Sequence, residues 1–509
     1  MSAAPQKSAN RGALILMGGT LGSRITGLLR NSLLTQLFSA GVSDAFVTAF
    51  KVPNLFRELL AEGALTNSFV PAFSRLGREE GARMASALLG VLLIANGALL
   101  VAAWFLAPWL AGLLIGDPGL VDIELTVRLI RIVFPFLLAI SMSALAMGLL
   151  NAVEEFLAPA WAPVALNVVT VALMALFPGQ AVLLALAHVL GGLAQLLVQL
   201  PALARHGLLP RRVKLWHPAL GGVLLLMVPF AVTSSGRQVL NLLASNVVTR
   251  IDAGAQTAFY NADLFLSLAL GLFSISPALA YYSRLSVLVN SEPEQVAPTL
   301  RAGLNLISFL TVPAGLALFL LAAPAVEVVF NWRSLLGSGA VDPRLALSVA
   351  ATAPLGFAVF PMGLNNLLIR TFYVRQQVRV PVIVTLLTLS VQGVLYVLLS
   401  QRFGLAGVAW AAAIAPALQL VVLLLLVARR ERFGLAGFLL QAVRVWLAAL
   451  GAAVALLGLQ RLVTVPDGWW WQLGWLLGAL ALYGLVFLGL CILLKVPGLQ
   501  AFLGRFRRR

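Results

Sequence analysis

Residues 85–115 read ASALLGVLLIANGALLVAAWFLAPWLAGLLI and contain no charged side chain. The hydrocarbon layer of a bilayer is about 30 Å thick, and a helix needs about 20 mostly apolar residues to cross it. Strands of a membrane β-barrel would instead show short segments of alternating polarity. This stretch therefore predicts a transmembrane helix.

The rest of the chain repeats this pattern. Hydrophobic residues make up 61% of the 509 residues and charged residues only 10%, whereas soluble domains are about one quarter charged. Apolar windows predict fourteen spans, near 13–38, 44–70, 85–115, 123–150, 157–178, 181–204, 220–249, 257–282, 300–330, 345–370, 380–400, 405–428, 440–462 and 470–495. The sequence predicts an all-α polytopic membrane protein of about fourteen transmembrane helices, with no room for a soluble catalytic domain.

Loop charges predict the orientation of these spans. An even number of spans puts both termini on one side, and most loop lysines and arginines then fall on that same side. The opposite loops hold only Arg250, Arg333, Arg344, Arg402 and Arg461. By the positive-inside rule both termini are cytoplasmic, as expected of a multi-pass protein of the inner membrane. The net charge of +17 is thus explained by topology and anionic lipid headgroups, and nucleic-acid binding is not expected.

Metal and redox chemistry find little support in the sequence. Cys491 is the only cysteine, so no disulfide can form within the chain. The three histidines, His188, His206 and His217, do not have the spacing of metal ligands. An integral-membrane glycosyltransferase or phosphatase would need carboxylate pairs or histidine sets near a membrane face. We interpret Glu154-Glu155 as a solvated turn, and predict no metal, no cofactor and no enzymatic activity.

Basic residues inside the spans are the candidates for function. A charge near the bilayer centre costs at least about 2.5–3.5 kcal/mol on insertion scales, so it normally faces a cavity or a partner. Eight lie within or at the edges of spans: Arg24, Arg30, Lys51, Arg57, Arg128, Arg131, Arg237 and Arg444. Four of the eight fall in the first two spans, which makes this pair of helices the expected site.

Depth sorts these four cations into two tiers. Arg24 and Arg57 lie near the middle of their spans, while Arg30 and Lys51 are each six residues nearer the outside, or about 9 Å at 1.5 Å per residue. If the two helices are antiparallel neighbours, the tiers line one helical hairpin.

Carboxylates offer a purely structural alternative, in which a midplane arginine, Arg24 or Arg57, pairs with Glu62 or Glu58. A third acid, Asp44, lies near the outer end of the second span. The first two spans therefore hold four cations and only three acids. This local excess favours an anionic ligand, and the planar guanidinium fork suits phosphate.

Backbone features surround these charges. Gly19, Ser23 and Gly27 repeat at four-residue spacing, which predicts close approach by another helix. Pro53 with Asn54 predicts a break in the second span, and broken membrane helices usually line a cavity.

Four segments near the N-terminus carry a resemblance to a known family. They read GSRITGLLR at 22–30, SDAF at 43–46, PNLFRELLAEGA at 53–64 and FVP at 69–71. GGLAQ at 191–195, QLP at 199–201, FYVR at 372–375 and PV at 381–382 are similar to the same family. With these motifs the chain closely resembles the MurJ (MviN) family over nearly its whole length. Members are lipid II flippases of the multidrug/oligosaccharidyl-lipid/polysaccharide exporter superfamily.

This resemblance implies two pseudo-symmetric six-helix lobes, spans 1–6 within 1–206 and spans 7–12 within 207–432. Spans 13 and 14, within 433–509, would form a groove for the undecaprenyl tail, followed by a basic cytoplasmic tail. Lipid II would pass from the inner to the outer leaflet by alternating access. The resemblance implies no cofactor, and its implied partners are lipid II, membrane lipids and cell-wall synthesis proteins.

The resemblance also assigns site residues by position. It implies that Arg24, Arg30 and Arg57 contact the substrate diphosphate or adjacent groups. The expected supporting or gating residues are Ser23, Asp44, Lys51, Asn54, Glu62 and Asp263.

One departure concerns the eighth span. Many members read Tyr-Ala-Asp-Arg there, with the arginine facing the cavity, but this chain reads Asn261-Ala262-Asp263-Leu264. We hypothesise that Arg237, inside the seventh span, replaces the missing cation as a substrate-binding residue. Asp263 could equally pair with Arg237 as a structural bridge, and the sequence leaves both interpretations open.

A second departure concerns coupling and cargo. Some relatives bind sodium through acids in C-lobe helices, but 213–251 and 343–430 contain no Asp or Glu. A sodium site of that kind is not expected, and the membrane potential, at about 2.3 kcal/mol per charge per 100 mV, is the alternative drive. The alternative cargo is another polyprenyl-diphosphate-linked glycan. A cation or drug exporter would need cavity acids to dominate.

Overall fold

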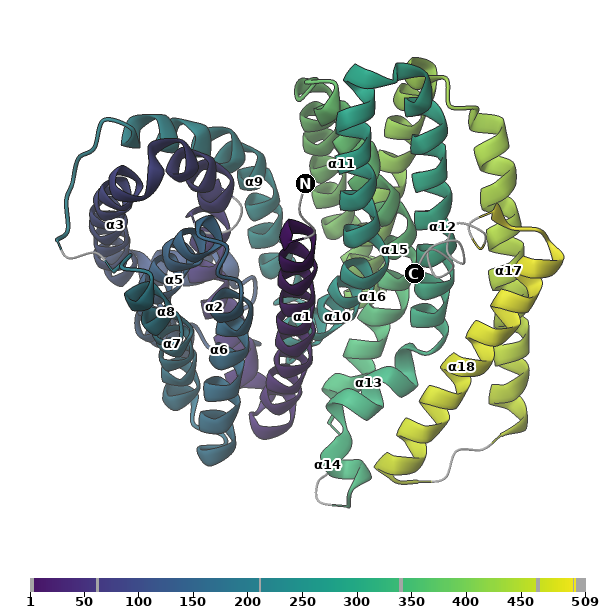
Figure 1. Ribbon diagram of the computed structural model, residues 1–509. Helices are drawn as coiled ribbons and strands as arrows, with labels where there is room; N and C mark the ends of the chain where they lie inside the picture. Colours follow the sequence, from purple (N-terminus) through teal and green to yellow (C-terminus); the bar gives the residue numbers. More distant parts are fainter. Residues whose placement is uncertain are drawn as a thin grey trace. The chain divides into compact units, whose positions relative to one another are not determined.

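The computed structural model describes residues 4–60, 64–209, 212–337, 342–463, 467–497 and 499, and in these ranges it contains helices and no strand. Two compact units divide the chain, Met1–Thr257 and Ala258–Arg509, and each is described by itself (Figure 1). The all-α membrane fold predicted from the apolar windows is confirmed, because ten helices in the described ranges are long and apolar enough to cross a membrane. The count of fourteen spans stays a prediction.

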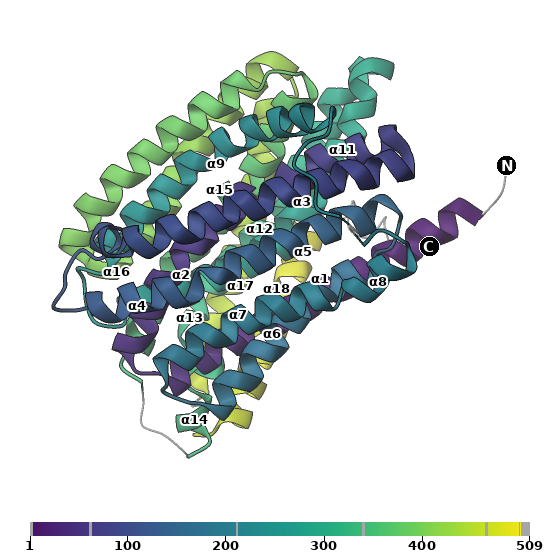
Figure 2. The same ribbon diagram turned by 90° about the vertical axis from the view of Figure 1, so that its left-hand side faces the viewer.

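The first unit holds nine helices within its described residues. They are α1 (Ala4–Leu37), α2 (Ala40–Leu60), α3 (Ala64–Leu114), α4 (Ile123–Val133), α5 (Pro135–Ala152), α6 (Leu157–Leu176), α7 (Ala181–Leu197), α8 (Leu200–Arg205) and α9 (Leu220–Val248). Helices α3, α5 and α7 lie side by side (Figure 2). Phe69, Met84, Leu88 and Leu149 form part of the apolar core between α3 and α5.

The second unit begins within α10 (Ala255–Leu270). A π-helical turn (Gly271–Ile275) and a 3-10 turn (Pro293–Gln295) interrupt its helices. The remaining helices are α11 (Ser276–Ser291), α12 (Val296–Leu320), α13 (Ala322–Phe330), α14 (Trp332–Leu335), α15 (Arg344–Val374), α16 (Arg379–Glu431), α17 (Leu435–Leu462) and α18 (Trp469–Leu493). Helices α12, α17 and α18 share an apolar core that includes Phe309, Ala449 and Phe487.

Two very long helices are pairs of helices joined at a glycine. Within α16, Gly404 has φ 54° and ψ −134°, and it lies between the predicted spans 380–400 and 405–428. Within α3, Gly77 has φ 74° and ψ 179°, so the predicted polar break at 71–84 is a kinked helix. Residues with a side chain rarely adopt such positive φ values, which explains why glycine occupies both bends.

The predicted break at Pro53 is wrong, because α2 continues as a helix through this residue to Leu60. Buried side chains just before the proline, including Phe46, Val47 and Val52, hold this part of the helix in place. Membrane helices tolerate proline where packing compensates for the lost hydrogen bond.

Helix α1 packs chiefly on α6, while α2 packs mainly on α4. A Cβ added at Gly19 would lie 2.3 Å from the carbonyl oxygen of Ala160 in α6. The close helix approach predicted at Gly19 is therefore confirmed, and its partner is α6. The first two helices do not form a closely packed hairpin along their length, so Arg24 and Arg57 lie on helices with different main neighbours.

Helix α9 packs along α3 inside the first unit, and the unit boundary falls after it at Thr257. The sequence places the lobe boundary before this helix, between residues 206 and 207. The unit boundary lies later in the chain than the predicted lobe boundary because α9 packs against α3 of the first unit. The functional lobes 1–206, 207–432 and 433–509 remain a prediction.

Substituting Gly19 with alanine is expected to destabilise the protein by about 1–3 kcal/mol, because the methyl group would overlap the α6 backbone. Gly18→Ala is the matched control, since a Cβ at Gly18 meets no atom within 4 Å. Thermal unfolding of both purified variants in the same detergent checks this prediction. Equal unfolding midpoints for the two variants would contradict the packing of α1 on α6.

Candidate functional site

Arg30 is held by two asparagine side chains. Its Nη1 donates to Oδ1 of Asn167 in α6 at 3.1 Å. Its Nε and Nη2 donate to Oδ1 of Asn31 at 3.3 and 3.4 Å. Arg30 is partly buried, and both asparagines are buried. Neutral amide oxygens thus fix the direction of this guanidinium from two helices.

Asn167 reaches a second part of α1. Its Nδ2 donates to the backbone oxygen of Ser23 and to Oγ1 of Thr26, both at 3.1 Å. The Thr26 hydroxyl in turn donates to the backbone oxygen of Gly22 at 2.7 Å. Ser23, a predicted supporting residue, therefore takes part in this network through its main chain.

Sequence reasoning missed Asn167. An available signal was its place in the apolar span 157–178, because a polar side chain buried in a membrane helix costs energy unless it is hydrogen-bonded. The sequence carried no information about which cation it would meet 137 residues away.

His188 in α7 is buried against aromatic rings of α2. Its ring centroid lies 4.5 Å from that of Phe46 and 5.2 Å from that of Phe50. Its Nδ1 lies 3.0 Å from the Leu184 oxygen. In the described ranges no group of three or more His, Cys, Asp and Glu side chains is arranged to hold a metal ion.

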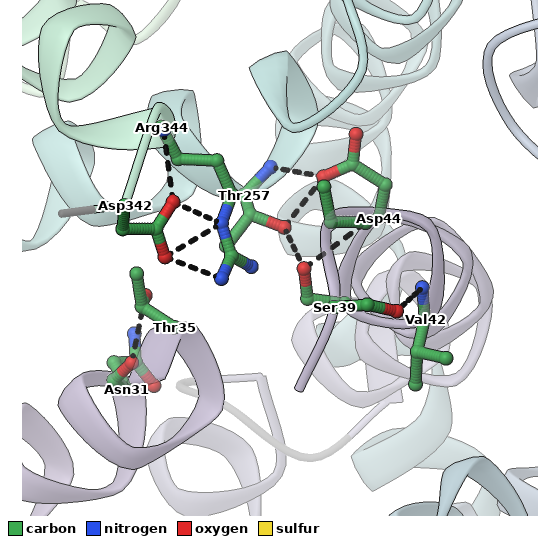
Figure 3. Close-up of polar contacts among 10 residues, drawn as sticks. Asn31, Thr35, Ser39, Val42, Asp44, Thr257, Asp342 and Arg344 are labelled. Atoms are coloured by element: carbon green, nitrogen blue, oxygen red, sulfur yellow. Dashed lines mark hydrogen bonds and ion pairs between the residues drawn. The ribbon is translucent and has the colours of Figure 1, made fainter. Parts of the chain in front are cut away.

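Asp44, at the start of α2, is fully buried and bonded to the first turn of α10 (Figure 3). One carboxylate oxygen accepts from the backbone N–H of Gly254 at 2.6 Å. The other accepts from the N–H of Thr257 at 2.9 Å and from the Thr257 hydroxyl at 2.5 Å. All of these residues belong to the first compact unit.

This arrangement gives α10 an N-cap supplied by another helix. The first N–H groups of a helix lack intrahelical acceptors and carry partial positive charge, so a carboxylate there is favourable. Gly254 has φ 90°, a conformation suited to glycine, at the point where the chain enters α10. Asp44 therefore links the beginning of α2 to the beginning of α10 through charge-assisted hydrogen bonds.

The remaining predicted residues are placed as follows. Arg24, Lys51, Asn54 and Arg57 are partly buried on α1 and α2. Arg237 is exposed on α9 in the first unit, and Asp263 is exposed on α10 in the second. Glu62 lies outside the described residues, as does the side chain of Glu58. The alternative pairing of Arg24 or Arg57 with these acids stays a prediction.

The fold and the site together define a class of protein. Helices long enough to cross a membrane carry partly buried arginines, which is an arrangement found in multi-pass membrane transporters. A solved structure shares this fold. The inward-facing conformation of a multidrug resistance MATE family transporter of the MOP superfamily aligns with TM-score 0.62 at 16% identity, over 82% of this chain and 95% of that one.

Sequence comparison identifies the family. The family model described as lipid II flippase MurJ matches residues 34–470. A lipid II flippase MurJ from Burkholderia cenocepacia is 31% identical over 90% of this chain and 91% of its own length. A probable lipid II flippase MurJ from Bdellovibrio bacteriovorus is 31% identical over 82% of each chain. This chain belongs to the lipid II flippase MurJ family, and the resemblance seen in its N-terminal motifs is confirmed.

The fold agrees with this membership. A solved structure of lipid II flippase MurJ in an inward closed conformation aligns with TM-score 0.78 at 20% identity, over 95% of this chain and 99% of that one.

Proposed function

We propose that this protein moves lipid II from the inner to the outer leaflet of the bacterial cytoplasmic membrane by alternating access. Family membership supports the cargo. The observation that carries the proposal is the guanidinium of Arg30, partly buried and oriented by amide oxygens from α1 and α6. An oriented guanidinium fork is well suited to a diphosphate.

Arg24, Arg30 and Arg57 bind the diphosphate and adjacent groups in this mechanism, with Lys51 and Asn54 beside them. Arg24 and Arg30 share α1, six residues apart, so a headgroup can exchange one cation for the next as it moves outward. No covalent bond is made or broken. Helices α17 and α18 of the predicted tail region hold the undecaprenyl chain, which stays in contact with lipid throughout.

Asp44 is the gating residue in this mechanism. The predicted topology, with both termini cytoplasmic, puts Asp44 and the turn before α10 at the outer side. The predicted lobe boundary puts Asp44 in one lobe and Thr257 in the other. Rocking of the lobes would break the bonds to Gly254 and Thr257 and open the outer side. Reforming them would close it.

A second candidate cargo is another polyprenyl-diphosphate-linked glycan, because the oriented guanidinium recognises the diphosphate that all such lipids share. Cell-wall synthesis proteins are the proposed protein partners, since they would consume lipid II after it is flipped.

Reconstitution tests the proposed cargo. The purified protein is placed in liposomes with fluorescent lipid II, and the fraction of label that an impermeant quencher reaches is followed with time. Lipid II should equilibrate between leaflets faster than in protein-free liposomes. A parallel sample carries an undecaprenyl-diphosphate-linked O-antigen unit. Movement of this lipid alone would favour the second cargo, and movement of neither would overturn the flippase proposal.

We propose that Arg237 supplies the cation missing from span eight. On this proposal, Arg237→Ala lowers the rate of lipid II flipping by about tenfold, as expected when one charge-assisted contact to a phosphate is lost. Arg250→Ala is the control, because Arg250 sits in the loop after α9 and its Nε donates to Asn246. An unchanged flipping rate with reduced thermal stability would instead support the structural bridge to Asp263.

A further inference from the structure

We propose that Asn167 is a positioning residue that orients Arg30 and the adjoining turn of α1 for the anionic headgroup. This inference rests on the proposed function, because it names a residue that sets the geometry of the same site. Asn167 does not belong to the set of charged side chains that bind the diphosphate, and it acts through Arg30.

The amide of Asn167 has only one orientation that satisfies all of its neighbours. Nδ2 has two N–H donors, and acceptors stand at 3.1 Å from it in both directions, the oxygen of Ser23 and Oγ1 of Thr26. Oδ1 is then left facing Nη1 of Arg30. In the flipped orientation the NH2 group of Asn167 would face the N–H donor of Arg30. The hydrogen bonds therefore fix the orientation of both the amide and the guanidinium.

The amide of Asn167 forms hydrogen bonds at two positions along α1. Ser23, whose carbonyl accepts from Nδ2, is the residue immediately before Arg24, and Arg30 is bonded to Oδ1. Asn167 therefore fixes the separation between the α1 segment that carries Arg24 and the guanidinium of Arg30. A headgroup that contacts both arginines requires that separation to be constant.

Helix α6 provides a rigid support for Asn167. One turn along, the Thr170 hydroxyl lies 2.8 Å from the Leu166 oxygen and 3.3 Å from the Ala187 oxygen of α7. A Cβ added to Gly191 of α7 would lie 2.4 Å from Thr170 Oγ1, so the two helices are in direct contact. Binding groups are most precise when they are supported by such packed helices.

A neutral amide is the side chain that such a position requires. A carboxylate at residue 167 would also accept a hydrogen bond from Arg30, but its negative charge would lie about 3 Å from the guanidinium, where interaction between charges is strong. That charge would compete with the phosphate for Arg30. Asn167→Asp therefore keeps an acceptor for Arg30 and removes the advantage for an anionic ligand.

The test is a double-mutant cycle with Asn167→Asp and Arg30→Ala, read out as the Kd for lipid II in detergent. Asn167→Asp is expected to weaken binding about tenfold or more in the presence of Arg30. In the Arg30→Ala background the same substitution should weaken binding clearly less, because its effect through Arg30 is gone and only its contacts with the turn at Ser23 and Thr26 remain. Equal effects in the two backgrounds, or no effect in either, would overturn the proposal.

Controls separate this proposal from a structural role and from the proposed function. Asn96→Asp is the matched variant: Asn96 is equally buried in α3, donates to the Leu92 oxygen and accepts from Ser141 Oγ. It should change stability without changing Kd. If Asn167→Asp does not fold, Asn167→Ser takes its place in the cycle. Failure of the unmodified protein to bind lipid II would overturn the proposed function itself, whereas binding with additive effects would overturn only the role of Asn167.

Discussion

Asp44→Asn is expected to shift the proposed outer gate about 100-fold toward its open state and to reduce lipid II flipping strongly. Replacing one carboxylate oxygen by an NH2 group sets a donor against the N–H of Gly254 or Thr257 and removes the charge. Buried hydrogen bonds to charged groups contribute about 1.5–3 kcal/mol each, and about 2.7 kcal/mol corresponds to a factor of 100.

A gate that does not close leaves the headgroup site accessible from outside and seldom accessible from inside. Lipid II enters from the inner leaflet in the proposed mechanism, so flipping falls with the population of the state closed on the outside. Asp44→Glu should also impair flipping, because the side chain is fully buried and its bonds of 2.5–2.9 Å leave no room for another methylene.

Two measurements check this prediction. The first is the rate of lipid II flipping in liposomes. The second is thiol labelling of a Ser43→Cys variant, made in a Cys491→Ala background so that it carries a single thiol. An impermeant reagent is added outside. Ser43 is buried beside Asp44, so opening of the gate would expose the new thiol. Asp252→Asn is the control, because this acid in the same loop is exposed and accepts a local hydrogen bond from the N–H of the adjacent Ala253. Unchanged flipping and labelling for Asp44→Asn would exclude a gate at this position.

The role of Asp44 illustrates how far the sequence could lead. The SDAF motif at 43–46 marked Asp44 as a supporting or gating residue through the family resemblance. Its partners could not be predicted, because they are mainly backbone N–H groups that every residue except proline possesses. The contact also joins residues more than two hundred positions apart, and only the folded chain brings them together.

Local sequence patterns gave correct predictions where the structural feature depended on the residues of a single helix. The apolar windows located membrane-long helices because burial in lipid depends on composition alone. Gly19 was correctly predicted as a close-approach position, although α6 as its partner came only from the structure. Pro53 shows the opposite case: the local rule predicts a break, and tertiary packing around α2 overrides it.

Asn167 lies between these cases. A buried amide in an apolar span can be suspected from sequence, but its hydrogen bond to Arg30 depends on how α6 packs against α1. The charged residues of the proposed site could thus be named from the sequence, while the hydrogen bonds from neutral groups that orient Arg30 could not.

Alanine substitutions of Arg24, Arg30 and Arg57 are expected to abolish complementation of a flippase-depleted bacterium that the unmodified protein rescues. Each removes charge-assisted bonds to the diphosphate, which contribute about 1.5–3 kcal/mol, or about 10- to 100-fold in binding. For Arg30 the loss also leaves Oδ1 of Asn167 without its guanidinium donor. Arg30→Lys should rescue only partly, because an ammonium keeps the charge and lacks the planar fork.

Arg131→Ala is the matched control for these substitutions. Arg131 is also an arginine at a membrane helix, but its Nε donates to the Trp104 oxygen at 3.1 Å and its guanidinium lies 5.1 Å from the Trp104 ring centroid. These contacts explain it structurally, so Arg131→Ala should still complement when its membrane level matches that of the unmodified protein. Full rescue by all three site variants would exclude a cationic headgroup site on α1 and α2. If the unmodified protein, present at normal levels in the membrane, failed to rescue, the cargo would be another polyprenyl-diphosphate glycan, because the arginines would recognise the diphosphate equally well in both lipids.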